Sequence, residues 1–281
     1  MKKVICIIVF VLGLFPVSAQ PQYSKEDSNK VVALLRGAPE KSTPSRLMVY
    51  FARQLKGIPY VAQTLEKNAN ERLVINLRQL DCTTYVENVL ALTRCALSGQ
   101  KNFSAFCKQL QMIRYEQGKV AYPQRLHYFS EWIADNTKKG YVKEVQAPNP
   151  PFTKVQKLNV YYMSRHASDY PMLVKHPAWT KEIRAMEERL NGKVFRYMPK
   201  STIANTSLFR KTIHDGDIIA IITQKAGLDT SHIGIAVWHQ DGLHMLNASQ
   251  IRHQVVEEPM TLYAYMKKHP SQTGIRIIRV K

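Results

Sequence analysis

Apolar residues recur at helical spacing along most of the first half of the chain, three or four residues apart. That period places them on one side of a helix, where they can pack on a core. The pattern predicts five helices, over residues 25–36, 45–55, 81–97, 103–113 and 126–136. The first half of the chain is therefore expected to be mainly helical.

The pattern changes at Asp217, after which short runs of β-branched and apolar residues follow one another. Before that point, residues 146–151 break any regular element, and the segment up to residue 199 is expected to form loops around a helix near 179–190. The later runs predict strands over 217–223, 232–238, 243–248, 252–257 and 275–280, interrupted by a helix near 260–268. Helices followed by sequential short strands indicate an α+β fold with a mainly antiparallel sheet and an insertion around 140–200.

The N-terminus has the pattern of a secretory signal peptide. A positive head, Met1-Lys2-Lys3, precedes an apolar run from Val4 to Val17, and Val17-Ser18-Ala19 has the small-x-small form of a cleavage site. The apolar run is shorter than the roughly 20 residues of a membrane span. We expect cleavage after Ala19, export to the periplasm or the medium, and a single domain over residues 20–281 without a stable membrane span.

The chain is strongly basic, but its net charge does not identify the partner. Removing Lys2 and Lys3 lowers the formal net charge from +19 to +17, which favours an anionic partner or surface. Lys and Arg are scattered, with no arginine-rich arm and no zinc-finger spacing, so nucleic acid is not expected. Anionic cell-wall fragments suit an exported protein better, and nothing in the sequence indicates an assembly larger than a monomer.

Three cysteines remain after cleavage, an odd number that leaves at least one thiol unpaired within a chain. Cys82 and Cys95 lie 13 residues apart on one predicted helix, which is about 20 Å and beyond disulfide reach. A bridge between Cys95 and Cys107 across the following turn stays open. On that interpretation Cys82 is the free thiol.

Cys82 has a position that suits a nucleophile. Asp81 is a good helix N-cap, which places Cys82 in the first turn. Unpaired N–H groups and the positive end of the helix dipole are expected to lower the thiol pKa there and to bind a developing oxyanion. Cys82 shares one helix face with Val86 and Val89, so the alternative interpretation is a buried structural cysteine. A catalytic role therefore requires a partner residue beside the thiol.

His232 is the candidate partner. In the predicted strand, alternation puts His232, Gly234 and Ala236 on one face and Ile233, Ile235 and Val237 on the other. The small residues leave room beside the imidazole. If the cysteine helix packs across that face, the two side chains can form a thiolate–imidazolium pair.

Asn247 is the candidate for holding the imidazole, with Ser249 as the alternative. A four-residue loop over 239–242 would pair Trp238 with Leu243 and bring Asn247 within side-chain reach of His232. A two-residue turn at Asp241-Gly242 would instead leave Asn247 about 13 Å along the sheet from His232. The loop length therefore decides whether Asn247 can orient the histidine.

These residues carry a family resemblance. Gly57-Ile58-Pro59-Tyr60, Asp81-Cys82, Gly216-Asp217, Ser231-His232-Ile233-Gly234 and Leu246-Asn247-Ala248-Ser249 occur in the order of NlpC/p60 cell-wall hydrolases. Arg125-Leu-His127-Tyr128 and Trp132 resemble the N-acetylmuramoyl-L-alanine amidase-like branch. The chain departs from the pattern of many relatives at Thr83-Thr84, where Ser-Gly is common, and at Asn247, where His is common.

The resemblance implies a papain-like fold with the catalytic helix packed on the sheet. It makes Cys82 the nucleophile, His232 the base and Asn247 the orienting residue. Contacts to substrate are expected from Tyr60, Asp81, Thr83, Arg125, Ser231 and Ser249. The implied reaction on soluble muropeptides is hydrolysis of the amide between N-acetylmuramic acid and L-Ala.

Two other functions stay open: cleavage between γ-D-Glu and the following diamino acid, and binding of muropeptides without turnover. Neither a zinc-ligand spacing nor a phosphate-binding glycine motif occurs, so neither a metal nor another cofactor is expected. Tyr161, Tyr162 and Trp179 could line a glycan cleft, although core packing explains them as well.

Overall fold

The computed structural model describes residues 20–281, so the predicted signal peptide and its cleavage site lie outside the described residues. Ten α-helices are formed in this part: Lys25–Arg36 (α1), Pro44–Gln54 (α2), Cys82–Leu97 (α3), Phe103–Arg114 (α4), Phe129–Lys138 (α5), Tyr162–Arg165 (α6), Pro171–Lys175 (α7), Trp179–Leu190 (α8), Ser207–Thr212 (α9) and Leu262–Lys267 (α10). Over residues 20–281, no helix is both long and apolar enough to span a bilayer.

The strands form one antiparallel sheet. They are Val142–Val145 (β1), Lys154–Lys157 (β2), Val194–Pro199 (β3), Ile218–Thr223 (β4), Thr230–Trp238 (β5), Leu243–Ser249 (β6), Gln254–Glu257 (β7) and Gln272–Val280 (β8). Their order is β2-β3-β8-β4-β5-β6-β7, and β1 pairs with β8 beside β3. Together with the helices, this sheet confirms the predicted α+β class.

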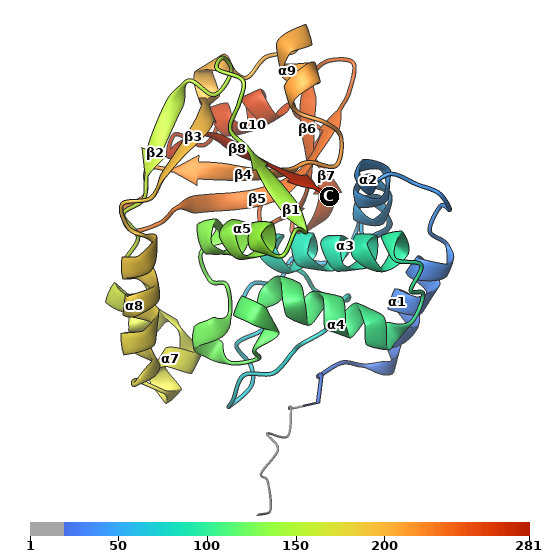
Figure 1. Cartoon of the computed structure of the whole chain (residues 1–281), viewed down its shortest axis with the longest axis vertical. Helices are drawn as coiled ribbons and strands as arrows, with labels where there is room; N and C mark the ends of the chain where they lie inside the picture. Colours follow the sequence, from blue (N-terminus) through green and yellow to red (C-terminus); the bar gives the residue numbers. More distant parts are fainter. Residues whose placement is uncertain (1–19) are drawn as a thin grey trace, which may run out of the picture.

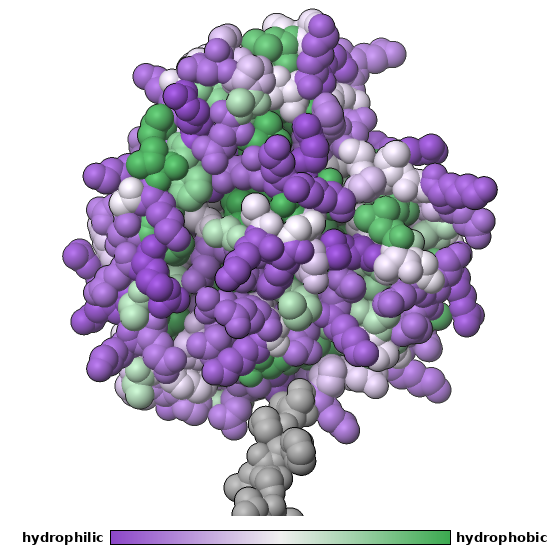
Figure 2. Space-filling model, in the orientation of Figure 1, coloured by the Kyte–Doolittle hydropathy of each residue, from purple (hydrophilic) through white to green (hydrophobic). Residues whose placement is uncertain are grey.

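Both faces of the sheet are covered, because successive residues of the central strand β4 enter different cores. Ile218 and Ala220 pack with α1 to α5, whereas Ile219 and Ile221 pack with α9 and α10 on the opposite face. A third cluster joins α7 and α8 to Tyr122 and Tyr128. Figure 1 shows α3 and α4 below the sheet, α2 to its right, α9 and α10 above it, and α7 and α8 at the lower left. Hydrophilic residues cover most of the face seen in Figure 2.

The segment before residue 199 differs from the prediction, because β1, β2 and β3 stand where loops were expected. These strands are short, and β2 is exposed or half-buried along its whole length, so no alternating apolar pattern marks it. What holds β1 and β3 is the edge of β8, with Val142 opposite Val280 and Met198 opposite Ile275. The insertion thus extends the sheet as well as adding helices to the fold.

Candidate active site

The first turn of α3 places Cys82. Asp81 accepts a hydrogen bond from the Thr84 N–H through Oδ1 at 2.8 Å, and the Asp81 N–H donates to Thr84 Oγ1 at 2.9 Å. These two bonds form a capping box, which satisfies backbone donors at the helix start. The predicted N-cap is confirmed, and Cys82 is the first residue of the helix.

Tyr60 reaches the same place through a short backbone pairing. Leu80 N–H donates to the Pro59 carbonyl at 3.0 Å, and Val61 N–H donates to the Leu80 carbonyl at 3.1 Å. This holds Tyr60 beside the residues that start α3. Burial is the main reason that the pKa of Tyr60 is raised to about 12, and the neighbouring Cys82 and Asp81 add to the rise. The phenol therefore stays protonated at neutral pH and can donate a hydrogen bond.

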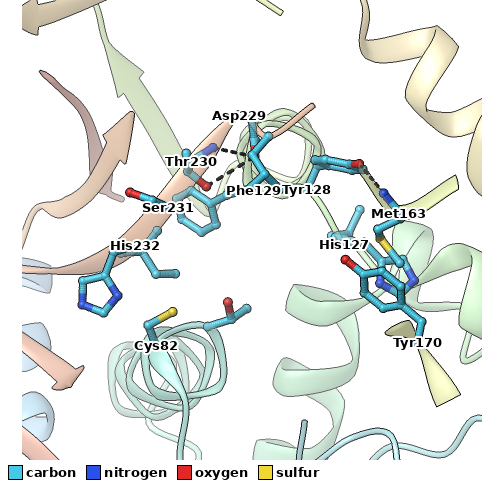
Figure 3. A pocket seen from close by; sticks show the side chains of 14 residues that line it. Cys82, His127, Tyr128, Phe129, Met163, Tyr170, Asp229, Thr230, Ser231 and His232 are labelled. Carbon is cyan, nitrogen blue, oxygen red and sulfur yellow. Dashed lines mark hydrogen bonds between the residues drawn. The ribbon is translucent and has the colours of Figure 1, made fainter. Parts of the chain in front are cut away.

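The hairpin of β5 and β6 places His232 against Asn247. Trp238 pairs with Leu243, which confirms the four-residue loop. The His232 Nε2 atom lies 3.0 Å from Asn247 Oδ1, and Asn247 is fully buried. An amide oxygen only accepts, so this contact puts the proton on Nε2 and leaves the Nδ1 lone pair free. Figure 3 shows the imidazole beside the Cys82 thiol.

The helix and the histidine strand meet differently from the expectation. α3 packs on the face that carries Ile233, Ile235 and Val237, not on the face of Gly234 and Ala236. His232 lies directly after an irregularity of β5, where Ile221 pairs with His232 but Ile222 pairs with Thr230. Such a bulge bends and twists a strand and re-aims its side chains. His232 thereby faces the start of the helix from the strand end.

Cys82 and His232 line one cavity of about 230 Å³. The other residues around it are Thr83, Leu126, His127, Tyr128, Phe129, Met163, Tyr170, Leu228, Asp229, Thr230, Ser231 and Ile233. Figure 3 shows the thiol and the imidazole at one end and Tyr170, Met163 and His127 at the other. Burial and the Arg125 charge lower the pKa of His127 to about 3, so this imidazole is neutral.

The protonation of the two reactive groups differs from the expectation at Cys82. Burial and the adjacent Asp81 carboxylate raise the pKa of the Cys82 thiol to about 12, against the lowering expected from the helix end. Burial also lowers the pKa of His232, although its hydrogen bond to Asn247 opposes that shift. Both shifts favour the neutral forms. The resting pair is therefore a thiol and an imidazole, not a thiolate and an imidazolium.

The other expected substrate contacts divide into two groups. Thr83 and Ser231 line the cavity. Arg125 does not: its guanidinium is buried and bound by Glu66 and by both carboxylate oxygens of Glu71.

Ser249 also lies away from the cavity lining. It is buried, and its hydroxyl accepts a hydrogen bond from the Arg252 N–H at 3.1 Å. Arg125 and Ser249 thus support the fold around the site instead of lining the cavity.

Residues of the insertion were missed by the sequence analysis. Met163 and Tyr170 line the far end of the cavity, and Tyr128 links them to the core by accepting from the Met163 N–H at 3.1 Å. Leu228, Asp229 and Thr230 were overlooked although they directly precede the predicted His232 motif. Adjacency to that motif was the signal for these three, whereas nothing local marks Met163 or Tyr170.

The three aromatic residues considered for a glycan cleft lie outside this cavity. Trp179 stacks on Tyr122 with ring centroids 5.5 Å apart, and it stacks on His176 at 4.0 Å. Tyr161 packs under the Arg165 guanidinium, and Tyr162 stacks on His166. Core and surface packing therefore accounts for them.

All three described cysteines, Cys82, Cys95 and Cys107, are free thiols. Within residues 20–281, the one grouping with metal-ligand geometry is His239, Asp241 and His244 at the β5–β6 loop. His244 is already bound by Asp241 and the Glu258 carbonyl, and His239 by Glu257. None of the three lines the cavity, so this grouping has no part in the chemistry at Cys82.

Comparison with known proteins agrees with this geometry. Residues 50–275 match the model of the N-acetylmuramoyl-L-alanine amidase-like family, AmiA-like. A crystal structure of an N-acetylmuramoyl-L-alanine amidase from Bacteroides uniformis ATCC 8492 is 35% identical over 85% of this chain and 100% of its own, with a TM-score of 0.80. A structure described as a putative xylanase from Bacteroides fragilis is 37% identical over 82% of this chain and 99% of its own, with a TM-score of 0.76.

A Legionella pneumophila protein at 22% identity and a TM-score of 0.69 shares the fold over 91% of this chain and 94% of its own. No curated protein matches the chain.

Proposed function

Because the chain belongs to the N-acetylmuramoyl-L-alanine amidase-like family, we propose that it is a cysteine hydrolase of the amide between N-acetylmuramic acid and the L-Ala of a stem peptide. The observation that carries the cysteine mechanism is the 3.0 Å contact of His232 with Asn247, beside a free thiol in the same cavity. We assign the site to the papain-like type, in which a cysteine at a helix start faces a histidine on a strand.

The reaction begins from the neutral pair. The Cys82 sulfur attacks the lactyl carbonyl carbon of the muramic acid as its proton passes to His232 Nδ1. His232 then gives this proton to the nitrogen of L-Ala, the carbon–nitrogen bond breaks, and the stem peptide leaves as a free amine. A thioester joins the lactyl group to Cys82.

Water completes the cycle. His232 takes a proton from a water molecule as the water oxygen attacks the thioester carbonyl. The carbon–sulfur bond then breaks, His232 returns the proton to the Cys82 sulfur, and the glycan is released with a free lactyl carboxyl group. Asn247 supports both halves because it holds Nε2–H and so leaves Nδ1 as the ring nitrogen that accepts the proton.

The oxyanion formed in each half has donors nearby. N–H groups in the first turn of a helix have no partner inside the helix, and Cys82 begins α3. Tyr60 adds a protonated hydroxyl from the other side. Such fixed donors stabilise the tetrahedral intermediate more than the ground state. We assign Asp81 to placing the helix start, and Thr83 and Ser231 to contacts with the substrate.

A single exported domain fits the proposed hydrolase. We propose that residues 20–281 act as a single hydrolase unit whose insertion supplies Met163 and Tyr170 to the cavity wall. Peptidoglycan lies outside the cytoplasm, so a family that cleaves it acts there, in agreement with the predicted signal peptide over residues 1–19.

Mass spectrometry of defined muropeptides incubated with residues 20–281 tests the proposal. We expect a stem peptide beginning with free L-Ala from the wild type, none from Cys82→Ala, and normal release from Cys107→Ala, which removes a buried thiol elsewhere. Cleavage after γ-D-Glu would replace the amidase with an endopeptidase. Absence of any product, with retained binding, would identify a muropeptide-binding protein.

A further inference from the structure

A second groove lies next to the catalytic cavity. It has a volume of about 400 Å³ and is bounded by β2, β3 and the connection from β4 to β5, with Lys157, Tyr161, Tyr197, Thr223 and Lys225 among its walls. Leu228 lines both the groove and the cavity. A hydrogen bond also joins them, because Gln156 Nε2 in the groove donates to the Asp229 carbonyl at 2.8 Å. The two hollows therefore adjoin at Leu228, which a chain bound in both would cross.

The charge of this lysine groove is positive and uncompensated. Lys157 and Lys225 are both exposed, and within residues 20–281 neither forms an ion pair. None of the residues that line the groove is acidic. Two free ammonium groups in one concavity attract a carboxylate, and more so where low-dielectric walls focus the field.

The catalytic cavity itself offers no such charge. The guanidinium of Arg125, which precedes the lining residue Leu126, is neutralised by Glu66 and Glu71. Asp229, which lines the cavity, carries a negative charge held by the Ser130 and Thr230 N–H groups. A carboxylate-bearing substrate therefore finds repulsion at Asp229 and attraction beyond Leu228.

Distances select which carboxylate reaches the lysines. Leu228 precedes His232 by four residues, a separation of at most about 13 Å along the backbone. From a scissile amide at Cys82, a stem residue adds about 3.5 Å and the γ-linkage of D-Glu adds about 2.5 Å. The α-carboxylate of D-Glu falls short at about 6 Å, whereas the third and fourth residues reach roughly 12 to 16 Å.

We propose that the lysine groove binds the carboxylate of the third or fourth stem residue, so that the stem peptide runs from Cys82 over Leu228 to Lys157 and Lys225. This inference rests on the proposed function, and it deepens it by setting the direction and the preferred length of the stem. The uncharged glycan then lies on the opposite side of Cys82, toward Tyr60.

Steady-state kinetics on two substrates test the direction. The substrates are a muramyl dipeptide, ending at D-Glu, and a muramyl tetrapeptide with free carboxylates. The K157Q/K225Q variant is expected to raise KM for the tetrapeptide about fivefold, with kcat within twofold and the dipeptide KM unchanged. In the wild type, amidation of the carboxylates on the third and fourth residues of the tetrapeptide should raise KM to the same extent. The K108Q/K211Q variant removes two exposed lysines from α4 and α9 and serves as the charge-matched control.

Calorimetric binding of the tetrapeptide to Cys82→Ala, with and without K157Q/K225Q, separates the two proposals. Equal tetrapeptide KM and equal affinity with and without the lysines would overturn the groove assignment and leave the amidase standing. Lysine-dependent binding without turnover by the wild type would retain the groove and refute the hydrolase.

Discussion

Replacing Asp81 with Asn tests why the Cys82 thiol is neutral at rest. The carboxylate belongs to the residue next to Cys82, and its charge is the second cause of the raised thiol pKa, after burial. At a separation of roughly 6 Å and an effective dielectric constant of about 40, two unit charges interact by about 1.4 kcal/mol. That energy corresponds to about one pKa unit. We therefore expect Asp81→Asn to lower the pKa of Cys82 from about 12 to about 11.

The assay is alkylation of Cys82 by iodoacetamide, followed by peptide mass spectrometry so that Cys95 and Cys107 are scored separately. At pH 9 a thiol of pKa about 12 is ionised in about one molecule per thousand, so the variant should react about tenfold faster. Asn caps a helix about as well as Asp, and its amide oxygen can accept the Thr84 N–H bond. The free energy of unfolding should therefore change by less than about 0.5 kcal/mol.

Asp81→Ala is the matched control, because it removes the charge and the cap together. It should show the same acceleration with a loss of about 1 kcal/mol of stability. Equal alkylation rates for wild type and Asp81→Asn at pH 9 would refute the electrostatic reasoning. Faster reaction of the wild type at pH 6 than a free thiol would show instead that the site holds a thiolate.

Three further outcomes follow from the same contacts. Asn247→Ala removes the hydrogen-bond acceptor at His232 Nε2 and should lower kcat/KM about 10- to 100-fold, which is less than the loss expected in His232→Ala. Steady-state kinetics measure this loss, and circular dichroism should show that the fold is unchanged. His232 must be neutral to accept the thiol proton, and burial lowers its pKa. The value of kcat/KM should therefore stay constant as the pH falls to 6.5 and decline only below that pH. An inflection of kcat/KM above pH 6.5 would contradict this reasoning. Arg125→Met leaves Glu66 and Glu71 unpaired in the interior and should destabilise the chain by about 3–5 kcal/mol in urea unfolding, whereas a large KM effect without destabilisation would restore Arg125 as a substrate contact.

The parts of the site that could be predicted depend on local signals. Asp81 before an apolar period of 3.6 marks the helix start, and the capping box confirms it. The loop over 239–242 fixes the register of a hairpin, and the register carries Asn247 to His232. Each of these needs only neighbours within about 20 residues.

The parts that could not be predicted depend on distant residues. β2 has no apolar alternation, and it forms because β3 supplies its hydrogen-bond partners from 40 residues later in the chain. Arg125 was expected to contact substrate because its positive charge suits a stem carboxylate. Its partners, Glu66 and Glu71, come from a loop before α3. Charge pairing across such distances leaves no pattern in the sequence near either partner.

The Cys82 pKa shows how a correct local prediction can lead to a wrong conclusion about charge. The N-cap that places the thiol is an acid, so the residue that builds the helix start also opposes ionisation of its first side chain. Burial adds the larger share of the rise, while a hydrogen bond with the backbone of Ile233 on β5 opposes it. A helix dipole contributes at most about 2 kcal/mol in favour of a thiolate, and burial and the Asp81 carboxylate oppose it. In the proposed mechanism the proton therefore leaves during attack and not before it, and the free Nδ1 of His232 is the group that accepts it.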